Sequence, residues 1–396
     1  MSATQKQQHH VVIVGMQFAG SAVLKALIKN PQVRITIVDS KDYFDLNLAT
    51  PRVLVQPAIA EATLLPHATW IANLAPQFAG RVSFVHARMT RVASTAITVQ
   101  LVATQALQDI AFDFLVLATG LGADYTNSLF KATRLDETSA KRVAALQSHN
   151  ARLLPAKKIL VVGGGAVGVE VAAEIATDYP DKTVTLVHSG SELVKLDPKS
   201  SKADTHARKF LTSHNVQLVL SDRIDRDAAN QAAALASHET PQTLKTEKGA
   251  EITADLVIVA LPPKAAGVSG ALSESFPGAI DEQGLLKVDQ YLRVASAGNN
   301  NIFAAGDVTN ADDKFAHRAT AAGAVVAANI LATIKKPAQP SLKTYSRLAS
   351  PVFAISMGRT YGFGRLPLLG YSHGWLVTSV KSKQMFVNAV PSTFKI

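Results

Sequence analysis

Residues 159–168, ILVVGGGAVG, decide the fold of this chain. A short apolar run leads into the glycines Gly163, Gly165 and Gly168, and a helical pattern follows them. At this spacing the first glycine permits a tight turn, the second lets the backbone approach a pyrophosphate, and the third lets helix and strand pack closely. The helix N-terminus then offers unpaired N–H groups to the phosphates. The stretch therefore predicts a strand–turn–helix unit that binds a dinucleotide.

A second version of this pattern occurs near the N-terminus, at residues 11–20, VVIVGMQFAG. Gly15 and Gly20 are in place, but Gln17 occupies the position of the middle glycine, where a side chain should crowd a diphosphate or force the loop outward. Asp39 ends the next predicted strand, where a carboxylate can accept hydrogen bonds from ribose hydroxyls. We predict a second dinucleotide site here; the alternative is a decayed site in a purely structural fold.

The repeat at residues 159–168 carries two further candidates. His188 stands at the end of its second predicted strand. An acidic side chain at this position would repel the 2′-phosphate of NADPH, and because none is present the site permits NADPH as well as NADH. The alternative for His188 is an ordinary exposed loop histidine. Glu170 lies in the first turn of the predicted helix, where it could orient a nicotinamide or simply favour the helix N-terminus by its charge.

Three more apolar runs, at residues 112–118, 254–260 and 301–305, lack polar alternation, which is typical of parallel strands covered on both faces. After Pro340 the chain becomes basic and aromatic-rich. We therefore expect an α/β protein with two Rossmann-like dinucleotide-binding domains, one interrupted by the other, and a small α+β C-terminal domain.

Residues 227–250, rich in Ala, Gln and Thr, are interpreted as a surface hairpin or loop.

The chain contains no cysteine, which excludes disulfides, thiolate metal sites, iron–sulfur clusters and cysteine nucleophiles. Any redox chemistry must therefore reside in a bound cofactor. The histidines show no spacing typical of metal ligands, and no Ser/His/Asp set has the context of a hydrolase. We expect neither a metal site nor hydrolytic activity.

Charge is distributed unevenly along the chain, whose formal net charge is +10. The last acidic residue is Asp313, and residues 314–396 hold 11 Lys and Arg. A basic end of this kind suggests an anionic partner, with a membrane surface favoured over nucleic acid. The alternative is that the charge serves solubility alone.

The termini and apolar runs bear on location. No apolar run is long enough for a membrane-spanning helix, and residues 1–10 lack the apolar centre of a secretory signal. Ser2 stands where N-myristoylation requires glycine. We expect a cytoplasmic protein, not secreted, that associates peripherally with a membrane; the mitochondrial outer surface and lipid droplets are candidates.

Taken together these residues resemble the flavoprotein reductases that have two dinucleotide-binding domains. Within them the chain is similar to the apoptosis-inducing factor-like branch that includes ferroptosis suppressor protein, with type II NADH dehydrogenases as more distant relatives. The most specific stretches are ATG at 118–120, VGGG at 162–165 through Glu170, AGD at 305–307, SMGR at 356–359, GFG at 362–364 and KSKQMFV at 381–387.

The resemblance implies FAD in a domain of residues 10–124 and 282–338, NADH or NADPH in a domain of residues 125–281, and a C-terminal domain of residues 339–396 on the quinone and membrane side. It places Glu170 and Lys381 in catalysis and Phe386 at the quinone. The FAD positions are Gly15, Gln17, Gly20, Asp39, Arg52, Thr119, Gly120 and Asp307, and the NAD(P)H positions are Gly163, Gly165, Gly168, Glu170 and His188.

The function that this resemblance implies is an NAD(P)H:quinone oxidoreductase, in which hydride passes from NAD(P)H to flavin N5 and two electrons then reduce a ubiquinone-type quinone to the quinol. Antioxidant or cell-death roles and a homodimer are compatible with it. The main alternative is a non-enzymatic NAD(P)H-binding protein that binds nucleic acid through its basic C-terminal region. A reductase of a small protein electron carrier is a third reading.

Overall fold

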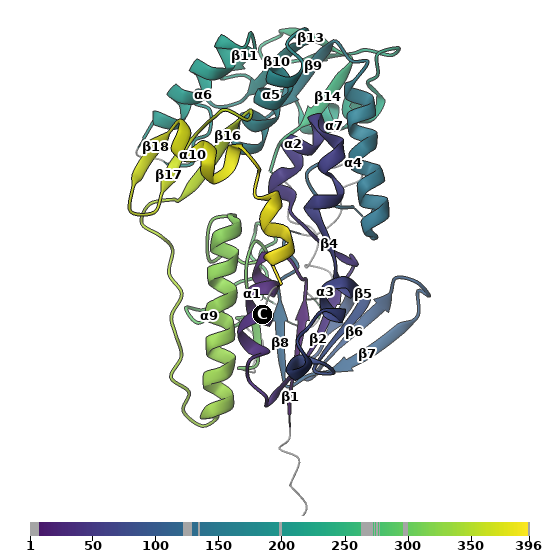
Figure 1. The fold of residues 1–396 in the computed structure, drawn as a ribbon, viewed down its shortest axis with the longest axis vertical. Helices are drawn as coiled ribbons and strands as arrows, with labels where there is room; N and C mark the ends of the chain where they lie inside the picture. The colour runs from purple at the N-terminus through teal and green to yellow at the C-terminus, as the bar shows by residue number, and fades with distance from the viewer. Residues whose placement is uncertain are drawn as a thin grey trace, which may run out of the picture.

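The computed structural model of the chain describes residues 8–121, 129–133, 135–197, 200–262, 272, 274, 276, 278–295 and 300–394. Figure 1 shows two α/β units stacked along the long axis of the molecule. The C-terminal segment, residues 339–394, runs beside the upper unit and then descends to the lower one, where the chain ends (Figure 1).

A seven-stranded sheet forms the lower unit. Its first five strands are parallel, and the last two continue as an antiparallel meander. Two helices, α1 (Phe18–Leu27) and α9 (Ala316–Lys335), share an apolar core with this sheet. The strand order is β15 (Ile302–Ala304), β8 (Phe114–Leu117), β1 (His9–Val14), β2 (Val33–Asp39), β5 (Val82–Val92), β6 (Ala96–Leu101) and β7 (Leu107–Ala111).

A four-stranded parallel sheet forms the upper unit, in the order β11 (Gln217–Leu220), β10 (Thr183–His188), β9 (Lys158–Val162) and β14 (Leu256–Val259). Both sheets place their glycine-containing turn after a strand whose residues are buried on both faces, as the uninterrupted apolar runs predicted. The unit also contains α4 (Ser139–Leu153), α5 (Ala166–Asp178), α6 (Lys202–Ser213) and the hairpin β12 (Gln242–Lys245) to β13 (Glu251–Ala254).

The prediction for residues 227–250 was wrong in part. The hairpin is present, but α7 (Arg226–Leu235) occupies the first half of the stretch. The Asp225 side chain accepts hydrogen bonds from the N–H groups of Asp227 and Ala228, and alanines fill the helix that follows. An N-cap aspartate followed by strong helix formers outweighs the low complexity of the stretch.

The two units repeat one topology, which confirms the expected fold class. In the lower unit β1 lies between β2 and β8, and in the upper unit β9 lies between β10 and β14. The registers match as well, because Val14 pairs with Leu117 and Val162 pairs with Val259 at the ends of the strands. Each unit therefore presents its glycine turn at the carboxyl edge of a parallel sheet, where such folds bind their ligands.

The segment after β2 bridges the units. It contains β3 (Tyr43–Asp45), α2 (Thr50–Val55), β4 (Leu64–Pro66) and α3 (His67–Ala72), with short 3₁₀ turns between them. Val53 and Leu54 of α2 belong to the core of the upper unit, although α2 follows the first strands of the lower one.

The C-terminal segment divides its apolar side chains between the two units. It forms the sheet β16 (Phe353–Met357), β17 (Tyr361–Leu366) and β18 (Gly370–His373), then α10 (Trp375–Val377), the π-helical turn η5 (Thr378–Ser382) and η6 (Val387–Ser392). Phe353 and Phe363 lie in the core of the upper unit, whereas Met385 and Phe394 lie in that of the lower unit. The predicted domain bounds, 10–124 with 282–338, 125–281 and 339–396, remain a prediction. Within the part of the chain described, no helix is both long and apolar enough to cross a membrane.

Candidate active site

The glycines of the upper turn fill the roles that their spacing predicts. Gly163 has a φ of +115°, and a Cβ there would lie 2.6 Å from the carbonyl oxygen of Ala260. A Cβ on Gly168 would lie 1.8 Å from the carbonyl oxygen of Gly163. Gly165, the N-cap of α5, faces open space. Gly163 therefore makes the turn, Gly168 permits close packing of the helix on that turn, and Gly165 leaves room at the helix N-terminus for a phosphate group.

The lower turn is built in the same way. Gly15 has a φ of +96°, and a Cβ there would lie 2.4 Å from the carbonyl oxygen of Ala118, while a Cβ on Gly20 would lie 2.0 Å from that of Gly15. Gln17 is the N-cap of α1, and its amide turns toward β3: Oε1 accepts from the Asp45 N–H at 3.2 Å. The side chain expected to crowd a diphosphate is thus tied to a neighbouring strand.

Asp39 and His188 occupy equivalent places in the two units. Asp39 is buried, and its Oδ2 accepts a hydrogen bond from the N–H of Met16 at 2.7 Å. His188 Nδ1 accepts from the N–H of Gly164 at 3.2 Å. Burial lowers the pKa of His188, and a neutral ring that accepts at Nδ1 carries its proton on Nε2. The conformation of the upper glycine loop is therefore stabilised by the neutral imidazole of His188, which carries no negative charge.

The carboxyl edge of β8 and β15 leaves polar groups for a ligand. Thr119 Oγ1 is buried without a hydrogen-bond partner in the described structure, and Gly120, with a φ of +70°, faces open space. Asp307 follows β15 on a half-exposed turn, and its Oδ2 lies 3.8 Å from Nζ of Lys131. A buried hydroxyl without a partner is costly unless a ligand satisfies it, so this edge fits a bound FAD.

Glu170 and Lys381, predicted separately as catalytic, form a buried ion pair. Lys381 Nζ lies 2.5 Å from Glu170 Oε1 and also donates to the carbonyl oxygen of Ala354 at 3.1 Å. The same Glu170 oxygen accepts the N–H of Ser356 at 2.8 Å. Both side chains are 7% exposed or less. The pair joins the nucleotide-binding helix α5 to the π-helical turn η5 of the C-terminal segment.

Arg52 forms a second buried pair beside the first. Its Nε and Nη2 donate to the two carboxylate oxygens of Glu174 at 2.6 and 2.8 Å, and Nη2 also donates to the carbonyl oxygen of Ser382 at 3.0 Å. Burial raises the pKa of Glu174, and the hydrogen bond from Arg52 opposes that rise. The described contacts of this guanidinium are with Glu174 and Ser382, and a contact of Arg52 with FAD remains a prediction.

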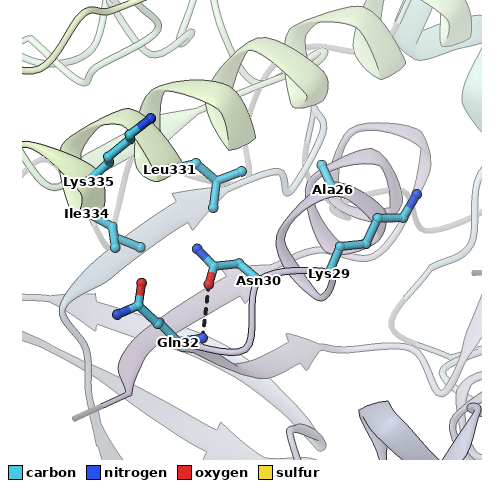
Figure 2. A pocket seen from close by; sticks show the side chains of 7 residues that line it. All are labelled: Ala26, Lys29, Asn30, Gln32, Leu331, Ile334 and Lys335. Atoms are coloured by element: carbon cyan, nitrogen blue, oxygen red, sulfur yellow. Dashed lines mark hydrogen bonds between the residues drawn. The ribbon is translucent and has the colours of Figure 1, made fainter. Parts of the chain in front are cut away.

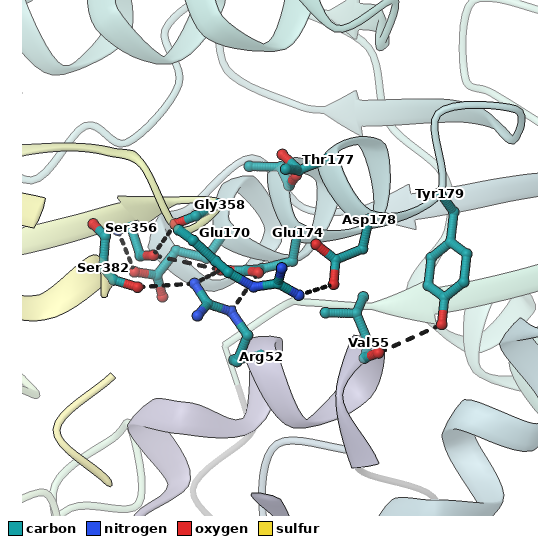
Figure 3. Close-up of polar contacts among 12 residues, drawn as sticks. Arg52, Val55, Glu170, Glu174, Thr177, Asp178, Tyr179, Ser356, Gly358 and Ser382 are labelled. Carbon is teal, nitrogen blue, oxygen red and sulfur yellow. Dashed lines mark hydrogen bonds and ion pairs between the residues drawn. The ribbon is translucent and has the colours of Figure 1, made fainter. Parts of the chain in front are cut away.

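The two pairs belong to one charged stripe along α5, whose carboxylates Glu170, Glu174 and Asp178 are labelled in Figure 3. Residues four apart lie on the same face of a helix, and three carboxylates follow that spacing here. Each is paired with a cation from a different segment: Glu170 with Lys381 of η5, Glu174 with Arg52 of α2, and Asp178 with Arg359 of the β16–β17 turn. Glu174 and Asp178 were not singled out in the sequence, although their spacing from Glu170 carried the signal.

Phe386 lies apart from the charged stripe. It is half-buried against the core of the lower unit and has a φ of +61°, and Met385 before it has a φ of +47°. Two consecutive left-handed residues without glycine reverse the chain between η5 and η6. A contact of Phe386 with quinone remains a prediction.

A surface cavity of about 420 Å³ lies elsewhere, between the C-terminal ends of α1 and α9 (Figure 2). Its lining includes Lys29, Asn30, Gln32 and Lys335. Because the glycine turn precedes the other end of α1, the cavity is separate from the dinucleotide site. Among the described residues no group of His, Cys, Asp and Glu could hold a metal ion.

Comparisons with known proteins identify the family. The pyridine nucleotide-disulphide oxidoreductase family matches residues 9–324. Apoptosis-inducing factor homolog B of Dictyostelium discoideum is 30% identical, covering 96% of both chains, and ferroptosis suppressor protein 1 of Homo sapiens is 30% identical, covering 98% of this chain and 96% of that one.

Solved structures share the fold at low sequence identity. The sulfide:quinone oxidoreductase of Aquifex aeolicus has a TM-score of 0.72 at 16% identity, covering 97% of this chain and 92% of that one. NDH2 of Plasmodium falciparum in complex with NADH has a TM-score of 0.72 at 12% identity, covering 98% of each. These structures confirm the fold, and the family match with the two relatives at 30% identity confirms the resemblance seen in the sequence.

This chain is an oxidoreductase, a flavoprotein that uses FAD with NADH or NADPH. It departs from the family's descriptive name in one respect, because without cysteine it has no disulfide of its own to reduce. With that qualification, the chain belongs to the pyridine nucleotide-disulphide oxidoreductase family.

Proposed function

We propose that the protein is an NAD(P)H:quinone oxidoreductase. The observation that supports this most is the buried Glu170–Lys381 pair, which ties the helix beginning at the nucleotide loop to the C-terminal segment. Bound FAD would supply the redox chemistry, taking hydride from the nicotinamide and giving two electrons to the quinone. The residues of the chain hold the reactants and set the local charge.

Nucleotide binding rests on the upper turn. The open face at Gly165 receives the pyrophosphate at the N-terminus of α5. Glu170 lies five residues further along the same helix, fixed by Lys381 and the Ser356 N–H, so its position relative to the bound nucleotide is set before binding. The neutral His188 leaves NADH and NADPH both acceptable.

Lys381 brings a positive charge into a buried region of the C-terminal segment. A preorganised cation of this kind stabilises negative charge that develops on a reduced ring or on a quinone oxygen. Phe386, five residues later in the chain, lies against the apolar core of the lower unit, and its contact with the quinone is part of the proposal. A quinone is favoured as acceptor because the chain has no cysteine for dithiol relay, and structural neighbours include a sulfide:quinone oxidoreductase.

The experiment is steady-state turnover of a water-soluble, short-chain quinone with NADH. We expect robust turnover by the wild-type protein, and Lys381→Met should lower kcat at least tenfold while Lys381→Arg retains most of it. Arg359→Lys, a change in a half-exposed partner of Asp178, is the matched control and should be nearly silent. If the protein reduced a ferredoxin but no quinone, the result would contradict the proposal. It would favour a reductase of a small protein electron carrier.

The nucleic-acid alternative receives little support from the charge geometry. At least five of the basic side chains after Asp313 are already paired with carboxylates from earlier in the chain. They are Arg318 and Arg347 with Asp312, Arg359 with Asp178, Arg365 with Asp197, and Lys381 with Glu170. DNA binding with a steep dependence on salt, together with negligible quinone turnover, would revive it.

A further inference from the structure

We propose that the turn between β17 and β18, residues 366–370, inserts into the headgroup region of a bilayer containing anionic phospholipid. The proposal rests on the proposed function only for its purpose, which is to bring the C-terminal segment to a membrane-dissolved quinone. Its physical basis is independent of catalysis.

The turn exposes two adjacent large apolar side chains. Leu368 is 106% exposed and Leu369 is 62% exposed. Single exposed leucines, such as Leu107 and Leu235, are ordinary on protein surfaces and do not indicate a binding site. Two neighbours at the apex of a hairpin are different, because they form one apolar projection that no contact in the described structure covers.

The backbone holds this projection in a defined shape. Leu368 has a φ of +61°, which is costly for a leucine, and the N–H of Leu369 donates to the carbonyl oxygen of Pro367 at 2.7 Å. The resulting three-residue turn directs the chain back at Gly370, whose φ is +67°. Strain of this kind at an exposed apex contributes nothing to a core and is typical of functional surfaces.

The turn can approach an anionic surface without repulsion, because a cation of the upper unit lies near it and a nearby carboxylate is neutralised. Residues 314–396 contain no Asp or Glu, so the turn and its flanking strands carry no carboxylate side chain. Lys202, at the start of α6, places its Nζ 5.7 Å from the ring of Tyr371, directly after the turn. The nearby Asp197 is paired with Arg365. Trp375, 79% exposed beyond the other end of β18, is a residue type that prefers membrane interfaces.

A bilayer fits this projection better than a second protein does. Stable protein interfaces bury roughly 800 Å² on each partner, far more than two leucines can provide. Interfacial membrane binding, in contrast, needs only a few apolar side chains combined with electrostatic attraction to anionic lipid. The turn therefore points to a phospholipid surface as its occupant.

The first test is sedimentation of the full-length holoprotein with vesicles of phosphatidylcholine, with and without phosphatidylserine. We expect binding that requires phosphatidylserine and weakens with salt. Leu368→Ser with Leu369→Ser should weaken the partition coefficient about tenfold or more, because the lost contacts are apolar. Leu107→Ser with Leu235→Ser, which alters exposed leucines outside the C-terminal segment, is the matched control and should bind like the wild type.

A fluorescence measurement locates the contact. The chain has two tryptophans, of which Trp70 is buried, so Trp375→Phe removes the exposed one. In that background Leu368→Trp should show a blue-shifted emission, quenched by brominated lipid, when phosphatidylserine vesicles are added. Leu107→Trp in the same background should show neither change.

Three results would overturn the proposal: no sedimentation with anionic vesicles, equal binding by the Leu368/Leu369 variant and wild type, or concentration-dependent self-association abolished by that variant without vesicles. Turnover of a water-soluble quinone separates the two proposals, since it needs no membrane. If turnover is normal while vesicle binding fails, only the docking proposal falls. If binding succeeds without quinone turnover, only the proposed function falls.

Discussion

The pairing of Glu170 with Lys381 has a consequence for stability. Removing one partner of a buried ion pair leaves an uncompensated charge, so Lys381→Met should lower the free energy of unfolding by about 3 kcal/mol. Glu170→Gln should also destabilise, and the double variant should lose clearly less than the sum of the two. Urea unfolding of the four proteins measures this coupling. Additive losses would show that the two side chains do not interact.

The buried side chain of His67 leads us to predict that the free energy of unfolding depends on pH. His67 is fully buried beside Trp70 and Phe394, and burial lowers its pKa from 6.5 to about 4. The folded chain then binds fewer protons at His67 than the unfolded chain does between these values. The free energy of unfolding should therefore fall as the pH is lowered from 6.5 toward 4.

His67→Phe tests the origin of this loss. It removes the titrating group while keeping an aromatic ring among its aromatic neighbours, so the decline of the unfolding free energy across that pH range should become shallower. Chemical denaturation at a series of pH values measures the slope. An unchanged slope would mean that other groups produce the acid sensitivity.

At the level of elements, the glycine turn of the upper unit separates binding from stability. A Cβ at Gly165 meets open space, so Gly165→Ala should leave the melting temperature within a few degrees of wild type while weakening NADH binding at least tenfold. Gly168→Ala is the contrasting variant, because its Cβ would overlap the Gly163 carbonyl and should destabilise the unit. Calorimetry and NADH titration measure both quantities. Tight NADH binding by Gly165→Ala would contradict the assigned phosphate site.

The elements also show what the sequence can and cannot predict. The doubled glycine pattern predicted both strand–turn–helix units, because their turns depend on local backbone sterics. The pairing of Glu170 with Lys381 was not predictable, since 211 residues separate them and only the folded C-terminal segment brings them together. The effect of Gln17 on a diphosphate remains a prediction, and the hydrogen bond of its amide to β3 could not be predicted, because no local pattern specifies the position of that strand. Low complexity likewise concealed α7.

For the whole molecule, the C-terminal segment fastens the two units together. Phe394 stacks on Trp70 with ring centroids 4.4 Å apart in the core of the lower unit. Phe394→Ala should therefore lower the free energy of unfolding by about 3 kcal/mol and shift the emission of Trp70 to the red in a Trp375→Phe background. Ser392→Ala, at an exposed neighbour, should change neither. Unaltered stability in Phe394→Ala would show that the chain end is not part of the core.

The most direct measurement is an anaerobic absorption titration of the purified protein. The two-site architecture predicts a yellow flavin spectrum that NADH or NADPH bleaches and that added quinone then restores, without any thiol reagent. Colourless protein that FAD cannot reconstitute, or a bound flavin that reduced pyridine nucleotide fails to bleach, would contradict the central claim.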